Sequence, residues 1–71
     1  MQPIKSSNLV EAERNPDGTV KVRFKNGLYQ SQSIVPLEIW NRFASTFQTP
    51  DSSGAFFHRH LKQFKFQKIN E

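Results

Sequence analysis

The sequence contains no cysteine and no long run of apolar residues. Without cysteine the chain can form neither disulfides nor thiolate zinc sites, which is typical of proteins in a reducing compartment. No apolar stretch approaches the roughly 20 residues of a membrane-spanning helix, and no signal-peptide core follows Met1. We therefore expect a cytoplasmic protein that does not interact with a membrane.

Acidic residues are scarce: six stand against ten lysines and arginines, which gives a formal net charge of +4. The imbalance is also local, because residues 52–70 carry four cations and no acid. Such a charge favours acidic partners, namely nucleic acid, an acidic protein surface or anionic lipid. At 71 residues we expect a single small domain, residues 1–71, whose ends at 1–5 and 67–71 are flexible.

Turn and strand signals dominate the first half of the chain. Residues 9–14 are a plausible first strand, and a Pro-Asp-Gly turn follows it. Residues 20–25 alternate between apolar and cationic side chains, which is typical of a half-buried strand with a cationic outer face. Asn26-Gly27 predicts a tight hairpin turn. Residues 28–34 should then return antiparallel, although their pattern does not show which face is buried.

The second half predicts two helices. Pro36 suits the first position of a helix, where its missing N–H is not needed. An apolar stripe follows at helical spacing: Ile39, Trp40, Phe43 and Phe47. A second core-facing stripe consists of Phe57, Leu61 and Phe64. Residues 64–68 alternate and are expected to leave the helix. The sequence thus predicts a monomeric α+β domain: a three-stranded antiparallel β-meander packed by two C-terminal α-helices, with a short extended tail.

Two histidines, His58 and His60, raise the question of a metal or catalytic site. Two positions apart on a helix, their side chains diverge by about 200° and cannot share an ion; the i, i+4 pair of zinc helices is absent. No recognisable nucleophile context exists, and a domain this small has little room for a pocket of the usual roughly 300–1,000 Å³. We expect no enzyme activity, no metal and no cofactor. The aromatic stripes are interpreted as core, with Phe66 as the best candidate for an exposed anchor.

Several short segments follow one another in a specific order: Ser6-Ser7-Asn8-Leu9, the strand ending at Phe24 with Asn26-Gly27, Val35-Pro36 before the aromatic helix, Ser53-Gly54 with Phe56-Phe57, and Leu61-Lys62. In this order the chain resembles, over nearly its whole length, the KTSC family. These small domains are named after the C-terminus of some lysyl-tRNA synthetases and also stand alone in bacteria and phages. The resemblance implies a β-rich α+β fold and suggests RNA binding. One departure is that the family's central Tyr-x-Tyr falls on Gln30 and Gln32 here, while Tyr29 is one residue out of that register and so on the opposite face of the strand.

Two functional hypotheses remain, and both rest on the same candidate partner-binding residues: Lys21, Arg23, Lys25, Arg59, Lys62, Lys65, Lys68 and Phe66. In the first, the chain is a phage-type regulator that docks on an acidic surface of a large assembly in the host cytoplasm. The best candidate is bacterial RNA polymerase, whose transcription it would modulate. In the alternative, it is a sequence-tolerant RNA-binding accessory domain. The two glutamines favour the first hypothesis, because they cannot replace aromatic stacking worth about 1–3 kcal/mol per base.

Overall fold

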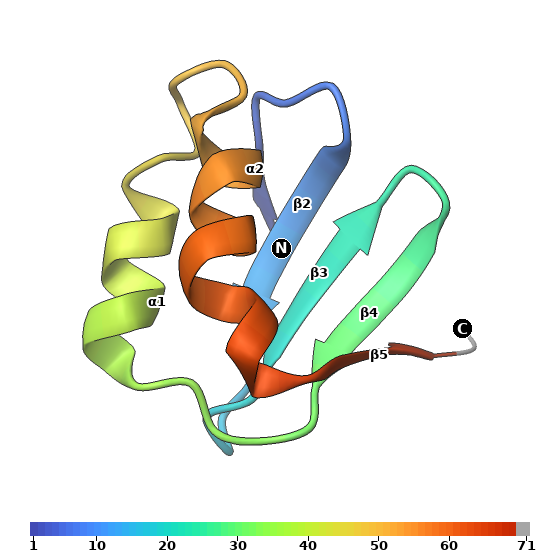
Figure 1. The fold of residues 1–71 in the computed structure, drawn as a ribbon, viewed down its shortest axis with the longest axis vertical. Helices are drawn as coiled ribbons and strands as arrows, with labels where there is room; N and C mark the ends of the chain where they lie inside the picture. Colours follow the sequence, from blue (N-terminus) through green and yellow to red (C-terminus); the bar gives the residue numbers. More distant parts are fainter. Residues whose placement is uncertain (70–71) are drawn as a thin grey trace.

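The computed structural model describes residues 1–69. Its elements, in chain order, are β1 (Gln2–Pro3), β2 (Leu9–Arg14), β3 (Val20–Phe24), β4 (Gly27–Ser31), α1 (Leu37–Ala44), α2 (Ser52–Phe56), η1 (Phe57–Leu61), η2 (Lys62–Phe64) and β5 (Phe66–Ile69). The π-helical turn η1 and the 3₁₀ turn η2 directly continue α2. This second helix and α1 lie side by side (Figure 1), and their buried side chains form one core with those of the sheet.

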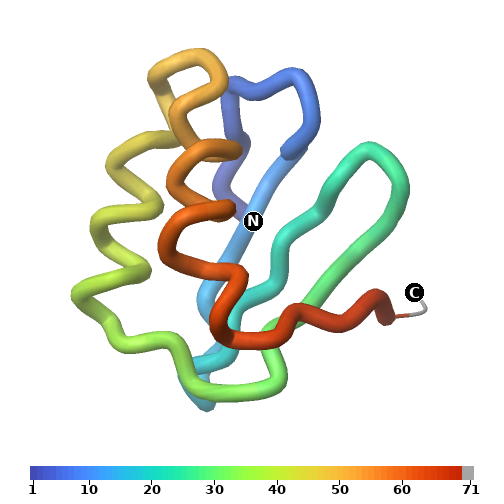
Figure 2. Tube along the Cα trace, in the orientation of Figure 1, coloured from blue at the N-terminus to red at the C-terminus, as the bar shows by residue number. Residues whose placement is uncertain are grey.

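The predicted three-stranded meander with two C-terminal helices is wrong, although the fold is α+β. The sheet has five antiparallel strands in the order β1-β2-β3-β4-β5, and the helices stand between β4 and β5. The expected extended tail is the strand β5, which turns back along β4 (Figure 2). Phe66 pairs with Ser31 and Ile69 with Leu28. Pairing gives the tail's backbone the hydrogen-bond partners that an isolated extended segment lacks.

The two ends expected to be flexible both contribute to the sheet. At the start of the chain, residues 2–3 form β1, in which Pro3 lies opposite Glu11 of β2. Proline is tolerated there because β1 is an edge strand, where a missing N–H removes no interior ladder bond. At the other end, residues 67–69 belong to β5. Positions 70 and 71 lie outside the described residues.

The alternation predicted for residues 20–25 is confirmed over β3. Val20 and Val22 are fully buried in the core under the helices. Directly opposed residues of antiparallel strands share a face, so the pairing of Val22 with Tyr29 places Tyr29 on this core face as well. Arg23 pairs with Leu28, and both therefore belong to the opposite face. The register thus settles the orientation of β4, which its own sequence pattern left open.

Both aromatic stripes pack into the core as expected. Trp40 and Phe43 are buried on α1, which begins one residue after Pro36, and Phe47 is buried in the turn that follows. On the second helix, Phe57 and Leu61 are buried. The rings of Trp40, Phe43 and Phe47 contact one another edge to face, with centroids 4.8 to 5.9 Å apart. Such contacts add to the area burial that holds a small domain together.

Candidate docking groove

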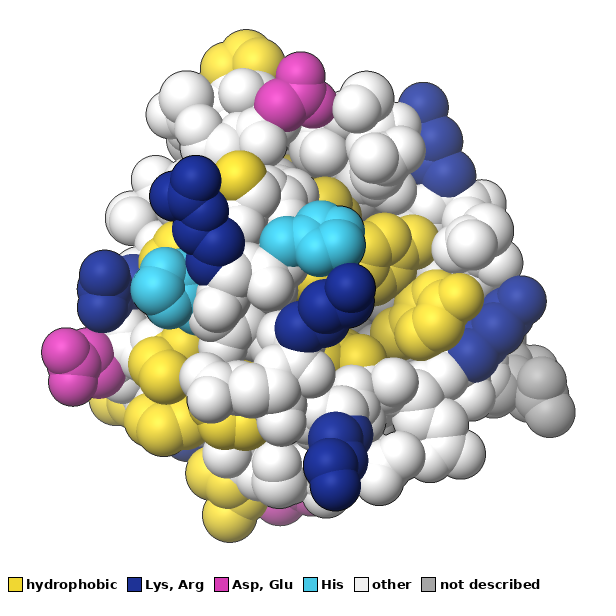
Figure 3. Space-filling view, viewed as in Figure 1, with side chains coloured by type: hydrophobic (Ala, Val, Ile, Leu, Met, Phe, Trp, Pro, Cys, Tyr) yellow, Lys and Arg dark blue, Asp and Glu magenta, His cyan; other side chains and the backbone are white. Residues whose placement is uncertain are grey.

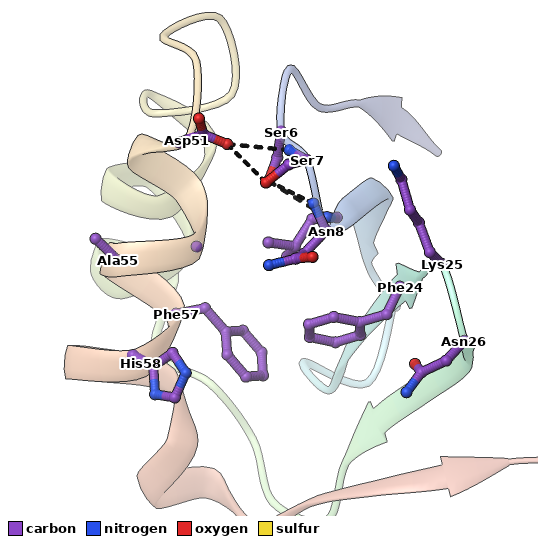
Figure 4. Close-up of a pocket in the computed structure, with 12 residues that line it drawn as sticks. Ser6, Ser7, Asn8, Phe24, Lys25, Asn26, Asp51, Ala55, Phe57 and His58 are labelled. Carbon is purple, nitrogen blue, oxygen red and sulfur yellow. Dashed lines mark hydrogen bonds between the residues drawn. The ribbon is translucent and has the colours of Figure 1, made fainter.

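A surface groove runs between the β3–β4 hairpin and the second helix. It consists of two adjoining hollows, of about 530 and 300 Å³, that share the side chains of Phe24, Asn26 and Phe57. Figure 4 shows Phe24 and Phe57 pointing toward each other across the larger hollow, one from β3 and one from the helix. The groove is therefore built from segments far apart in sequence, and its shape depends on how the helix docks on the sheet.

Aromatic rings form the floor of this groove. The Phe24 ring lies edge to face with Tyr29 at 5.1 Å and with Phe57 at 5.2 Å. Phe66 of β5 continues the row at 4.8 Å from Phe57. Tyr29, Phe24 and Phe66 are partly exposed, whereas Phe57 is buried. The rings interlock at steep angles, so the floor is a notched apolar surface and not a set of parallel ring faces.

Four lysines border the aromatic floor. Lys25 lines the larger hollow, and Lys62 and Lys65 line the smaller one. Lys68 reaches from β5 across Gly27, where an added Cβ would lie only 2.7 Å from its Cε. Figure 3 shows this face with hydrophobic side chains bordered by lysine or arginine and by a histidine. Together with Phe66, five of the eight predicted partner-binding residues therefore lie in or beside the groove.

The remaining predicted cations lie elsewhere. Lys21 and Arg23 face away from the helices, because β3 alternates, and there they meet the acids of β2. Arg23 Nε is 3.0 Å from the Glu11 carboxylate, and Lys21 pairs in register with Glu13. The expected single row of Lys21, Arg23 and Lys25 is thus divided. Its first two members lie opposite acids of β2, and Arg23 forms an ion pair there, whereas Lys25 follows the end of the strand and lines the groove. Arg59 is exposed on η1 and lines neither hollow.

A hydrogen-bonded tie closes the far end of the groove. The backbone N–H and hydroxyl of Ser7 both donate to Oδ1 of Asp51, at 3.0 and 3.1 Å (Figure 4). The Ser6 hydroxyl accepts from the N–H groups of Asn8 and Leu9. Asp51 adopts a left-handed conformation with φ 63°, which brings its carboxylate back to the β1–β2 loop. The tie fixes this loop against the start of α2 and leaves one acid, Asp51, in the described lining.

The groove does not hold a recognisable catalytic arrangement within residues 1–69. Asp51 bonds directly to Ser7, whereas a catalytic triad needs a histidine between the carboxylate and the serine. His58 lines the same hollow and forms no hydrogen bond with the described residues. In that same range no three or more His, Asp or Glu side chains come together as a group that could hold a metal ion.

Sequence reasoning missed three parts of the site: the ring floor of Phe24 and Tyr29, the amides of Asn8 and Asn26, and the tie at Asp51. A usable signal was present, because Phe24 and Tyr29 stand on either side of the predicted hairpin turn. Rings so close to a hairpin tip extend past the helices that cover the rest of the sheet. Phe57 was assigned to the core, and it does pack there while also lining both hollows.

No helix within residues 1–69 is both long enough and apolar enough to cross a membrane. Comparison of the chain with protein-family models, with curated proteins and with solved structures gave no match. The resemblance to the KTSC family therefore stays a prediction that rests on the residues quoted for it.

Proposed function

We propose that this chain is a non-enzymatic docking protein that uses the groove to bind an acidic surface of a large assembly. Bacterial RNA polymerase is the first candidate assembly, and modulation of transcription is the expected effect. The observation that carries the proposal is the meeting of four lysines with an aromatic floor in one groove. Aromatic anchors at the centre of a patch with a polar rim are the usual composition of an energetically dominant protein-binding site.

The backbone of Lys65 supports a functional role for this charge. Lys65 ends η2 in the left-handed region, at φ 55°. A residue with a side chain pays about 1–2 kcal/mol for this conformation, and glycine is the preferred residue there. A lysine at the end of a helix regains only about 0.3–1 kcal/mol from the helix dipole. Stability alone therefore favours glycine, and a need for a cation at the groove explains the lysine.

RNA binding is the second candidate function, and the mixture of rings and cations favours it. Proteins that bind single strands combine a positive groove with aromatic side chains on which bases stack. Stacking needs an accessible ring face, however. Phe24 already has neighbours at 5.1 and 5.2 Å, Tyr29 and Phe57, packed at about 80° to its plane. Such a floor suits an inserted apolar side chain better than a row of stacked bases, which is why protein docking is the first proposal.

The test is a pull-down from bacterial lysate with tagged protein, in nuclease-treated and untreated halves washed at rising salt. Three variants accompany the parent chain: Lys62→Glu, Lys65→Gly and, as a control for total charge, Lys5→Glu. Lys5 is exposed and lines neither hollow. Binding to purified bacterial RNA polymerase, with the same variants, tests the first candidate directly.

We expect a nuclease-resistant protein partner that Lys62→Glu and Lys65→Gly lose and that Lys5→Glu keeps. Its retention should fall with salt, because screening weakens exposed charge pairs. A partner that all three variants keep would refute docking through the groove. Loss of every partner after nuclease, with RNA recovered from the untreated half, would instead establish the second candidate function.

A further inference from the structure

We infer that the occupant of the groove is an extended acidic peptide segment carrying one aromatic or long aliphatic side chain. The inference rests on the proposed docking function and specifies the chemistry of the partner. It starts from the difference between the two hollows. The smaller one is walled by Phe24, Tyr29, Phe57 and Phe66, with Lys62 and Lys65 beside them. The larger one has a greater share of polar groups in its lining than the smaller one, and it continues toward Ser7.

The smaller hollow fits a single large side chain. Its volume of about 300 Å³ is at the lower limit of sites that hold a whole small molecule. Three of its four rings are partly exposed, so an apolar group that enters would remove ring surface from water on several sides. That burial is the main source of affinity for an anchor residue. Lys62 and Lys65 line the same hollow, so acidic residues next to the anchor in the peptide would lie close to them.

The larger hollow presents groups that suit a peptide backbone. Asn8 and Asn26 both line this hollow, and Figure 4 shows their side-chain amides on different sides of the Phe24 ring. Neither amide forms a hydrogen bond with another residue of the described range 1–69. Each amide offers both a donor and an acceptor, which matches the alternating N–H and C=O groups of an extended chain. Asn26 lines both hollows and Asn8 only the larger one, so the two amides provide a polar track that starts at the anchor site and continues into the larger hollow.

The position of Asp51 distinguishes a peptide from a nucleic-acid strand. The carboxylate of Asp51 lies at the polar end of the groove, opposite the end that carries Lys62 and Lys65. A nucleic-acid strand carries a phosphate at every nucleotide, so one phosphate would be placed near this carboxylate. A peptide can place its acids beside the lysines and a neutral residue beside Asp51. Charge complementarity along the groove thus favours a peptide whose acids cluster around its anchor.

The experiment is an amide NMR titration of the folded chain with defined probes. The first probe is a blocked tripeptide of glutamate, phenylalanine and glutamate. The second has alanine in place of phenylalanine, the third has lysine in place of both glutamates, and the fourth is an eight-nucleotide oligouridine. The reporters are the amides of Asn26, Gly27 and Gly54, since Asn26 and Gly54 line the groove and Gly27 contacts Lys68. Lys62→Glu and Lys5→Glu serve as groove variant and control.

We expect the acidic aromatic tripeptide to shift these amides in a saturable way, about tenfold more tightly than its alanine analogue. The lysine analogue should leave them unmoved, and Lys62→Glu but not Lys5→Glu should weaken the first probe. Equal binding of the first two probes, or tighter binding of oligouridine, would overturn the inference. So would silence of all four probes. If a pull-down partner then still depends on Lys62 and Lys65, the docking proposal stands with a folded surface as occupant; if no such partner exists, both proposals fail.

Discussion

Replacing Ser53 by alanine should stabilise the protein. Ser53 on α2 is fully buried, and its Oγ has no hydrogen-bond partner within residues 1–69. A buried polar group without a partner costs about 1–3 kcal/mol. Alanine also has the higher helix propensity, by up to about 0.7 kcal/mol. The small void left by one oxygen atom offsets part of this gain, so we expect Ser53→Ala to raise the free energy of unfolding by about 1–3 kcal/mol.

Urea unfolding followed by tryptophan fluorescence measures this change. The single tryptophan, Trp40, is 6% exposed and contacts the rings of Phe43 and Phe47, so its emission reports on the intact core. In a thermal melt of a domain this size, each kcal/mol of added unfolding free energy should raise Tm by roughly 4–8 °C. Ser52→Ala is the matched control, because Ser52 lies on the same helix but is only partly buried. The change in unfolding free energy of Ser52→Ala therefore measures the contribution of helix propensity alone.

The reasoning fails if Ser53→Ala stabilises no more than Ser52→Ala, or if it destabilises the chain. Either result would mean that the hydroxyl is satisfied in solution, for instance by an ordered water molecule. A gain in unfolding free energy clearly above that of Ser52→Ala would show that the unpaired hydroxyl destabilises the folded state. Ser53→Ala would then be the background of choice for groove variants, because a domain this small has little stability to spare.

Other predictions concern the edge of the groove, the open sheet face and the first turn. Lys65→Gly should raise the free energy of unfolding by about 1 kcal/mol in urea melts; a loss of stability would contradict the strain assigned to φ 55°. A double-mutant cycle of Arg23→Ala and Glu11→Ala should give a coupling of about 0.2–1 kcal/mol, since both side chains are about one-third exposed. The hydrogen bonds from the hydroxyl and backbone N–H of Thr19 lower the pKa of Asp17 below its ordinary value. This contribution to stability is present above the unfolded-state pKa and is lost as pH falls through the folded-state value. NMR titration should show the Asp17 midpoint rising in Thr19→Ala, and an unchanged midpoint would disprove the assigned cause.

The central hairpin was predictable from sequence because its signals are local. Alternation over β3 places Val20 and Val22 on one face. The Asn26-Gly27 signal locates the hairpin to within one residue: Gly27 already pairs with Phe24, so Lys25 and Asn26 form the turn. Both features act between neighbouring residues, so no knowledge of distant contacts is needed. The aromatic stripes of the helices are local in the same sense, since the spacing of Phe57 and Leu61 alone selects their buried face.

The outer strands could not be predicted because their partners lie outside any local pattern. β1 has only two residues, too few for a period to be recognised. β5 follows the helices, and it pairs Phe66 with Ser31 across 35 positions of sequence. The alternation of residues 64–68 did indicate extended backbone. The sequence carries no signal that this segment would lie beside the free edge of β4 once the second helix had docked.

The charge pattern of β3 has the same limitation. In the sequence, Lys21 and Arg23 form a cationic row with Lys25, and their neighbours on β2 are separated from them by a turn. The strand register decides whether these cations face acids, because it sets Glu11 opposite Arg23 and Glu13 opposite Lys21. A strand's outward charges can be counted from sequence, but whether they remain unmatched depends on how the adjacent strand pairs.

Departures from regular helix geometry gather in the segment that walls the groove. The second helix is preceded by Asp51 in a left-handed conformation, widens to a π-helical turn at η1 and ends at left-handed Lys65. Ser53, with its unpaired hydroxyl, lies on the same helix. π-turns and unfavourable backbone conformations are most often retained at functional sites. In contrast α1, which lines neither hollow, is a regular α-helix with an acid in its first turn and a cation in its last. Both helices belong to one small domain that needs stability, and the proposed docking function would account for the difference between them. The proposed role of Lys65 makes this explanation testable: glycine there should give a more stable chain that binds its partner less well.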